Sequence, residues 1–170
     1  MINIVLIEPE IPQNTGNIAR TCAAVGARLH LVEPMGFEID DAKLKRAGLD
    51  YWHFLDIVYY KNTDDFLEKN GGENLIFFTA KAAKLYTEAD YGGSPFLIFG
   101  RESVGISEDV LKNNLESCVR IPMRDNLRSL NLSNCAAIAV YEALRRQNFD
   151  GLKFEGKFAD LQQPSIGDIS

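Results

Sequence analysis

The chain has 170 residues, 46% hydrophobic and 25% charged, a composition typical of a soluble globular protein with a sizeable core. Its formal net charge of −6 argues against wholesale nucleic-acid binding, because phosphate neutralisation requires clustered lysine and arginine. No apolar run approaches the roughly 20 residues that span a bilayer, and residues 1–7 lack the basic start of a signal peptide. The cysteines, Cys22, Cys118 and Cys135, form neither a metal-binding pattern nor a disulfide framework, which favours a reducing, cytoplasmic location.

Short apolar runs alternate with patterns of helical spacing, which predicts an α/β fold with a mainly parallel sheet and helices on both faces. Glycine, proline and capping residues mark the expected ends of each element. We expect strands at residues 3–7, 28–32, 57–60, 75–79, 96–99 and 118–121. We expect helices at residues 15–25, 40–48, 63–69, 107–113 and 132–146, the first capped by Asn14 or Thr15.

One domain is expected over residues 1–152, because strands and helices alternate there without an internal repeat or linker. From Phe149 onward the periodicity is lost and glycines recur. Residues 153–170 are therefore expected to form a tail, either loose or packed through Phe154 and Phe158.

Several familiar catalytic and nucleotide-binding motifs are absent from the sequence. It has no G-x-G-x-x-G fingerprint after a strand, no phosphate-binding G-x-x-x-x-G-K-[ST] and no G-x-S-x-G nucleophile elbow. Of the two histidines, His30 lies inside an expected strand and is predicted to be a packed residue, which leaves little besides His53 for a metal site or a catalytic triad.

Three strand-to-helix junctions remain as candidate sites, because open α/β sheets bind ligands at the carboxyl ends of their strands. The first is N-T-G-N-I-A-R at residues 14–20, and the second is F-G-R-E-S-V-G-I at residues 99–106. The third, at residues 121–134, combines helix-starting serines and asparagines with nearby arginines, Arg120, Arg124 and Arg128. Free backbone N–H groups beside positive charge favour an anionic ligand. The residues alone therefore indicate a nucleotide-type ligand.

Together the three motifs resemble those of the SPOUT-class, or trefoil-knot, RNA 2′-O-ribose methyltransferases. The similarity is greatest to the small single-domain subgroup that methylates the wobble nucleotide of tRNA. The stretches E-P-E-I-P-Q-N-T-G-N, E-P-M-G-F and L-K-R-A-G-L-D-Y, in that order, strengthen the resemblance, which covers about residues 2–150. One position departs from the pattern, since Ile106 stands where leucine is usual; the change is conservative.

The resemblance implies S-adenosylmethionine as the methyl donor, no metal, a deep C-terminal trefoil knot and a homodimer with its active site near the subunit interface. Carried over by position, the residues implied in donor binding are Phe78, Thr79, Gly100, Ile121, Met123, Ser129 and Leu130. Those implied in catalysis and substrate binding are Arg20, Asn14, Glu102, Asn131 and Tyr141, with Ser133. The implied substrate is the anticodon stem-loop of tRNA, with the wobble nucleotide either cytidine or a modified uridine.

Arg20 matches a position that is often assigned the activation of the ribose hydroxyl in the family that this chain resembles. A guanidinium keeps its proton at neutral pH, so we favour Arg20 stabilising the developing alkoxide or gripping a phosphate. The acidic total is compatible with RNA if a dimer doubles local basic patches formed by Arg124, Arg128, Lys43 and Arg46.

Two alternatives to an enzyme remain. A non-catalytic nucleotide- or RNA-binding module on the same fold would keep the donor loops but could drop Arg20 and Glu102, and this chain has both. A flavodoxin-like phosphate-binding domain is disfavoured, because the expected Ser/Thr/Gly-rich loop after the first strand is replaced by E-P-E-I-P-Q-N.

Overall fold

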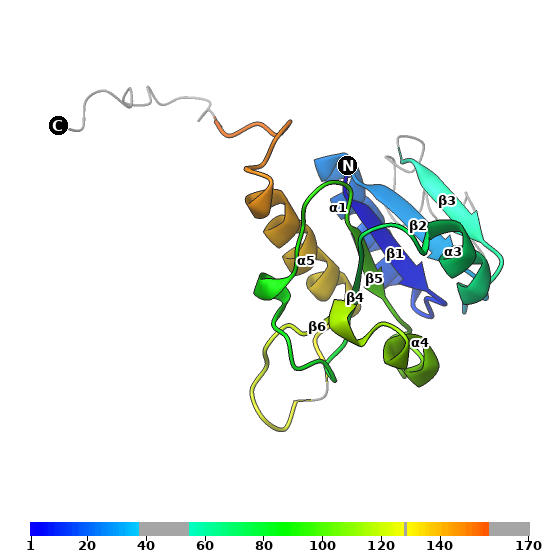
Figure 1. Ribbon diagram of the computed structural model, residues 1–170. Helices are drawn as coiled ribbons and strands as arrows, with labels where there is room; N and C mark the ends of the chain where they lie inside the picture. The colour runs from blue at the N-terminus through cyan, green and yellow to red at the C-terminus, as the bar shows by residue number, and fades with distance from the viewer. Residues whose placement is uncertain (38–54, 128, 157–170) are drawn as a thin grey trace.

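The computed structural model describes residues 1–37, 55–127 and 129–156. Its core is a six-stranded sheet in the order β3-β2-β1-β5-β4-β6, with every neighbouring pair parallel (Figure 1). The predicted α/β class with a parallel sheet is therefore confirmed. The strands are β1 (Asn3–Ile7), β2 (Arg28–Val32), β3 (Ile57–Tyr60), β4 (Leu75–Phe78), β5 (Phe96–Phe99) and β6 (Cys118–Val119).

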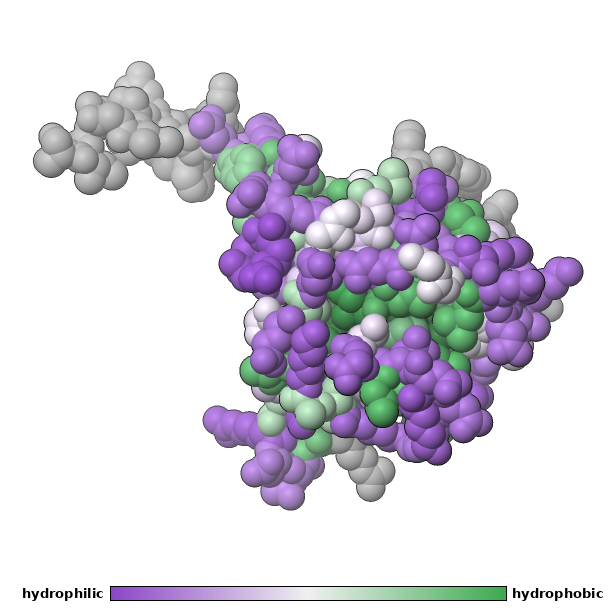
Figure 2. All heavy atoms as spheres, viewed as in Figure 1, coloured by the Kyte–Doolittle hydropathy of each residue, from purple (hydrophilic) through white to green (hydrophobic). Residues whose placement is uncertain are grey.

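Helices cover both faces of the sheet. They are α1 (Pro12–Val25), α3 (Thr63–Asn70), α4 (Glu108–Lys112) and α5 (Leu132–Arg146), with 3₁₀ turns η2 (Tyr86–Glu88) and η3 (Leu115–Ser117). Successive side chains of a strand point to opposite faces. On β1, Ile4 and Leu6 therefore join the apolar cluster that contains Ile18 of α1, whereas Val5 joins the cluster that contains Phe66 of α3. Figure 2 shows apolar side chains over the sheet between α3 and α5, framed by polar ones.

The sheet has a topological switch point between β1 and β5. From β1 the chain moves outward through β2 to β3, whereas from β4 it moves inward to β5 and then outward to β6. The connection after β1 leads to one side of the sheet and the connection after β5 leads to the other side. The two connections therefore separate at the ends of adjacent parallel strands. Such a divergence is where parallel sheets bind ligands.

Helix α1 begins at Pro12, three residues before the predicted start at Thr15. Proline suits the first position of a helix, where a backbone N–H would lack an intrahelical partner. The prediction that Asn14 or Thr15 caps this helix was wrong, because the cap residue is Ile11, which makes no side-chain capping bond. The Asn14 side chain is thereby left available for other partners.

Strand β6 is shorter than predicted, two residues in place of four. After Val119 the chain pairs with the segment that follows β4, since Arg120 N donates to Lys84 O and Arg120 O accepts from Tyr86 N, both at 2.9 Å. At Arg120 this pairing takes the place of a continued strand β6. The predicted helix at 40–48 and most of the aromatic segment with His53 lie outside the described residues.

The segment that joins β4 to β5 lies alongside α5 (Figure 1). The Gln147 side chain, directly after α5, donates to Tyr91 O at 2.7 Å and to Gly93 O at 3.3 Å. Two parts of the chain that are far apart in sequence are thus joined by hydrogen bonds. The trefoil knot itself stays a prediction. Within the described residues, no helix has both the length and the apolar character to cross a membrane.

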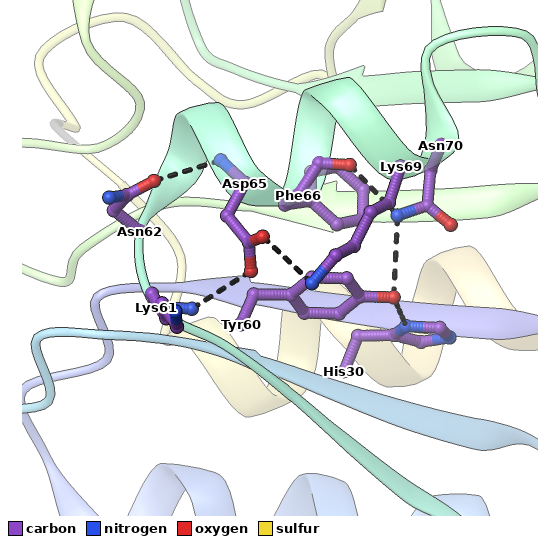
Figure 3. A network of polar contacts seen from close by, with 8 residues as sticks. All are labelled: His30, Tyr60, Lys61, Asn62, Asp65, Phe66, Lys69 and Asn70. Atoms are coloured by element: carbon purple, nitrogen blue, oxygen red, sulfur yellow. Dashed lines mark hydrogen bonds and ion pairs between the residues drawn. The ribbon is translucent and has the colours of Figure 1, made fainter.

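A buried polar chain crosses one side of the sheet (Figure 3). The Asn70 amide donates to the Tyr60 hydroxyl at 3.3 Å, and that hydroxyl lies 2.9 Å from Nδ1 of His30. Nε2 of His30 lies 3.1 Å from Oδ1 of Asn3. Because this amide oxygen can only accept, Nε2 carries the proton and Nδ1 accepts from Tyr60. His30 is therefore a neutral, packed residue, as predicted.

We expect the protein to lose stability in mild acid through His30. Burial, with a smaller contribution from the charge of Arg28, lowers the pKa of His30 to about 4. An unfolded histidine has a pKa near 6.5, so the unfolded state takes up a proton first as the pH falls. The free energy of unfolding should drop by about 2 kcal/mol between pH 7.5 and pH 5 through this residue. Urea unfolding of wild type and of His30→Gln between pH 7.5 and pH 5 would measure this drop. If the free energy of unfolding fell equally with pH in both proteins, the assignment to His30 would be contradicted.

Candidate active site

A cavity of about 500 Å³ opens where the strands end at the switch point. This volume lies within the range of small-ligand pockets. It is lined by residues after β4, β5 and β6, by two residues at the start of α1 and by the start of α5. The lining residues are Ile11, Asn14, Phe78–Lys81, Phe99–Ile106, Ile121, Met123, Ser129–Leu132 and Cys135.

One part of the cavity has apolar walls. The rings of Phe78 and Phe99 stack with centroids 4.9 Å apart and planes 20° apart. Ile121, Met123 and Leu130 come from the segment after β6. Flat aromatic and aliphatic surfaces of this kind suit the two faces of a planar heterocycle, while backbone groups at strand ends can pair with its polar edge.

The turn after β5 folds tightly back onto Gly100. Gly105 N donates to Arg101 O at 2.8 Å, and Gly105 has φ +74°, in the left-handed region that favours glycine. A Cβ atom on Gly100 would lie 2.2 Å from the Gly105 carbonyl carbon and 2.3 Å from Ile106 N. Position 100 therefore has no room for a side chain, because the backbone of Gly105 and Ile106 occupies that space.

A chain of hydrogen bonds joins the three sequence motifs. The Glu102 carboxylate accepts from Glu10 N at 2.8 Å, Ile11 N at 3.2 Å and Asn14 Nδ2 at 3.0 Å. Asn14 Oδ1 in turn accepts from Asn131 Nδ2 at 2.9 Å. Each motif therefore contributes one side chain to a single network.

The far end of this network starts helix α5. Asn131 Oδ1 accepts from Ser133 N at 2.9 Å, Asn134 N at 3.3 Å and the Ser133 hydroxyl at 2.7 Å, so Asn131 is the helix cap. The amide of Asn131 is thereby fixed by the helix on one side and by Asn14 on the other. The hydroxyl of Ser133 is therefore engaged by the cap residue Asn131.

The structure brings most of the predicted site residues together. All seven residues implied in donor binding line the cavity, as do Asn14, Glu102 and Asn131. Arg20 and Tyr141 do not line it: Arg20 is exposed on α1, and Tyr141 is 51% exposed on α5. The roles of all these residues stay predictions.

The positive charge of the cavity comes from residues other than those expected. Arg120 and Arg124 do not line it, and Arg128 lies outside the described residues. Lys81 and Arg101 do line it, and each is paired with an acid, Lys81 Nζ with Glu108 at 2.5 Å and Arg101 Nε with Glu8 at 3.3 Å. The cavity therefore carries little unneutralised positive charge from these two residues.

Sequence reasoning missed Glu10, whose carboxylate accepts from Ser103 N at 2.9 Å and from the Ser103 hydroxyl at 2.8 Å. The only signal was the position of Glu10 inside the stretch E-P-E-I-P-Q-N, directly after β1. The cysteines, by contrast, are as predicted, unpaired by disulfides. Burial raises the pKa of Cys22 to about 12 and raises that of Cys135, so neither thiol is a ready nucleophile.

Residues 1–141 match the model of the SpoU rRNA methylase family. The chain belongs to this family. A SpoU relative from Saccharophagus degradans, named tRNA (cytidine(34)-2′-O)-methyltransferase, is 47% identical and the match covers 90% of this chain and all of that protein. A solved structure described as giving insights into 2′-OH methylation of C/U34 on tRNA is 43% identical, with a TM-score of 0.81 over 88% of this chain and 97% of that one.

A third relative bears on the cofactor. The S-adenosylmethionine-bound rRNA methyltransferase from Sinorhizobium meliloti is 26% identical, with a TM-score of 0.75 over 85% of this chain and 56% of that one. The present cavity fits such a molecule: it has apolar walls for an adenine ring at Phe78, Ile121 and Met123, and a glycine at position 100 where any side chain would collide with the opposite turn. The chain therefore has the SpoU fold and a cavity whose lining suits S-adenosylmethionine.

Proposed function

We propose that this protein transfers a methyl group from S-adenosylmethionine to the ribose 2′-hydroxyl of the wobble nucleotide, cytidine or a modified uridine, in the tRNA anticodon loop. The observation that carries the proposal is the meeting of three motifs at one cavity, where Glu102, Asn14 and Asn131 form one network beside the apolar walls. The names of the similar proteins support the same reaction on the same nucleotide.

The residues that would hold the donor fall into two groups. Apolar side chains of Phe78, Ile121, Met123 and Leu130 would cover the adenine ring, and Thr79, Gly100 and Ser129 would offer polar or backbone groups at the strand ends. When bound, S-adenosylmethionine supplies an electrophilic methyl group on a sulfonium, which is an excellent leaving group. The protein therefore has mainly to exclude water, align the ribose hydroxyl and stabilise its developing negative charge.

The polar network gives the acceptor side of the cavity its shape. Glu102 uses both carboxylate oxygens to hold the loop before α1, and Asn14 and Asn131 keep each other's amide in place. Such a network preorganises polar groups before the substrate arrives, which lowers the reorganisation that the reaction requires. We assign Glu102 to this positioning and Arg20 to the alkoxide or the adjacent phosphate.

The proposal includes a homodimer in the cytoplasm. Arg20 and Tyr141 lie on α1 and α5, outside the cavity of their own subunit. Exposed apolar side chains on α5, Ile138 at 36% and Tyr141 at 51%, suit a face that pairs with a second copy. A second subunit at this face would place the two α1 helices, with Arg20, near the pair of cavities. It would also double the basic residues available to a tRNA arm.

The first experiment is transfer of labelled methyl from S-adenosylmethionine to bulk tRNA that lacks 2′-O-methylation, followed by nucleoside mapping. We expect label in a 2′-O-methylated anticodon nucleotide. No transfer despite measured donor binding would favour the non-catalytic binding module or reveal a required prior tRNA modification. Absence of both transfer and donor binding would contradict the proposed function.

A further inference from the structure

Glu10 takes no part in the reaction proposed above, yet both its carboxylate oxygens bond to one residue of another loop. Oε2 accepts from Ser103 N at 2.9 Å, and Oε1 accepts from the Ser103 hydroxyl at 2.8 Å. Glu10 precedes α1 and Ser103 follows β5, so the contact joins two segments 93 residues apart in the chain. These are the segments that diverge at the switch point.

The contact is reciprocal. While the Glu10 carboxylate holds Ser103, the Glu10 backbone N–H donates to Oε2 of Glu102 at 2.8 Å. Each loop thus presents a carboxylate to the backbone of the other, and hydrogen bonds to ionised acceptors are the stronger kind. The Ser103 hydroxyl and then its N–H lower the pKa of the Glu10 carboxyl below its ordinary value, against a smaller opposing effect of burial, so Glu10 is ionised near neutral pH.

Both partners of the contact are backed by close backbone packing. Behind Glu10, Gly36 N donates to Pro9 O at 2.9 Å, and a Cβ on Gly36 would lie 2.9 Å from the Glu10 Cα. Behind Ser103, the backbone of Gly105 and Ile106 lies so close to Gly100 that a Cβ there would be 2.2 Å from the Gly105 carbonyl carbon. A displacement of Ser103 would therefore shift the whole turn, which forms one wall of the cavity.

We propose that Glu10 and Ser103 are positioning residues of the methyl-donor site. Their hydrogen bonds hold the 100–106 turn at the place where it completes the cavity wall. This inference rests on the proposed function, since it takes S-adenosylmethionine as the cavity's ligand. It predicts that the effects of changing the two residues are coupled and are felt in donor affinity, whereas a surface contact that only stabilises the fold would leave affinity unchanged.

The test is a double-mutant cycle with S-adenosylhomocysteine, the reaction product, as the calorimetric probe, and methyl transfer measured in parallel. Glu10→Ala should weaken binding about tenfold, the loss expected for hydrogen bonds to a charged acceptor. Ser103→Ala, which keeps the backbone N–H, should weaken it by about threefold, and the double variant should be no weaker than Glu10→Ala. Glu10→Gln should restore part of the affinity, because its amide oxygen still accepts from Ser103 N. Glu73→Ala, an equal loss of charge at an exposed position before β4, is the matched control.

The outcomes separate the inference from the proposed function. If wild type binds and transfers methyl while Glu10→Ala behaves like Glu73→Ala, the positioning role is overturned and the proposed function stands. Independent, additive losses from the two residues would also overturn it, since the contact would then not be the cause. A wild-type protein that neither binds the probe nor transfers methyl would overturn both.

Discussion

A Gly100→Ala variant is expected to bind S-adenosylmethionine at least about tenfold more weakly than wild type and to methylate tRNA about 100-fold more slowly, the cost of a misplacement near 1 Å. The added Cβ would lie 2.2 Å from the carbonyl carbon of Gly105 and 2.6 Å from its oxygen. These are backbone atoms and cannot rotate away, so the backbone of the turn must shift to make room for the Cβ. Glu102 and Ser103 would move with it, and their hydrogen bonds to the loop before α1 would lengthen.

Gly72→Ala is the matched control for this variant, because a Cβ at Gly72 would meet nothing within 4 Å. Calorimetry with S-adenosylhomocysteine and single-turnover methylation would be measured on both variants, with circular dichroism to establish folding. Gly100→Ala should lose about 1–3 kcal/mol of stability, as overpacked sites do, and remain folded. Wild-type donor affinity in Gly100→Ala would show that the turn does not form the donor wall.

The sheet was predictable from the sequence because its strands are dense apolar runs with clear ends. Four strands, β1, β2, β3 and β5, have the predicted bounds. The side chains of β1 and β5 are buried on both faces of a parallel sheet, which produces a continuous apolar run rather than alternation. The predicted bounds were wrong where a tertiary contact determines the end of a strand. Strand β6 stops early because Arg120 pairs with the segment after β4, a partner that no local pattern reveals.

The start of α1 shows the same limit. Asn14 has the residue type of a helix cap, and local preference places it at the cap. In the structure its amide bonds to Glu102 and Asn131, 88 and 117 residues away, and Pro12 starts the helix instead. The competing partners exist only in the folded chain. Local propensity is therefore overridden at the position where the site needs the side chain.

The candidate site was predictable as a set of positions but not as a network. The motifs identified ten residues that line one cavity, because the carboxyl ends of parallel strands meet at one edge. Glu10 was missed because its role depends on a contact with Ser103. The two residues are 93 positions apart, so no local sequence pattern indicates the contact. Arg20 and Tyr141, which the motifs also marked, lie on helix surfaces outside the cavity.

An Arg20→Ala variant is expected to lower the turnover of tRNA methylation by about 100- to 1000-fold, the effect of removing one preorganised charge at a developing oxyanion. Donor affinity should change by less than about twofold, because the proposed partners of Arg20, the ribose alkoxide or the adjacent phosphate, belong to the tRNA and not to the donor. Alanine is the best helix former, so α1 should remain intact. Arg146→Ala, another exposed helix arginine, is the control. Equal losses in turnover and donor affinity would exclude the proposed role of Arg20.

Mixed dimers would decide whether Arg20 acts on its own subunit's cavity or across the proposed dimer. Subunits carrying Arg20→Ala and subunits carrying Gly100→Ala would be co-expressed with different tags. If Arg20 acts across the dimer, each mixed dimer pairs an intact donor cavity with an intact Arg20, so an equal mixture should recover about a quarter of wild-type activity from two inactive parents. If Arg20 acts within its own subunit, no mixed dimer contains a complete site and no activity returns. Recovery would therefore establish both the dimer and the direction in which Arg20 reaches.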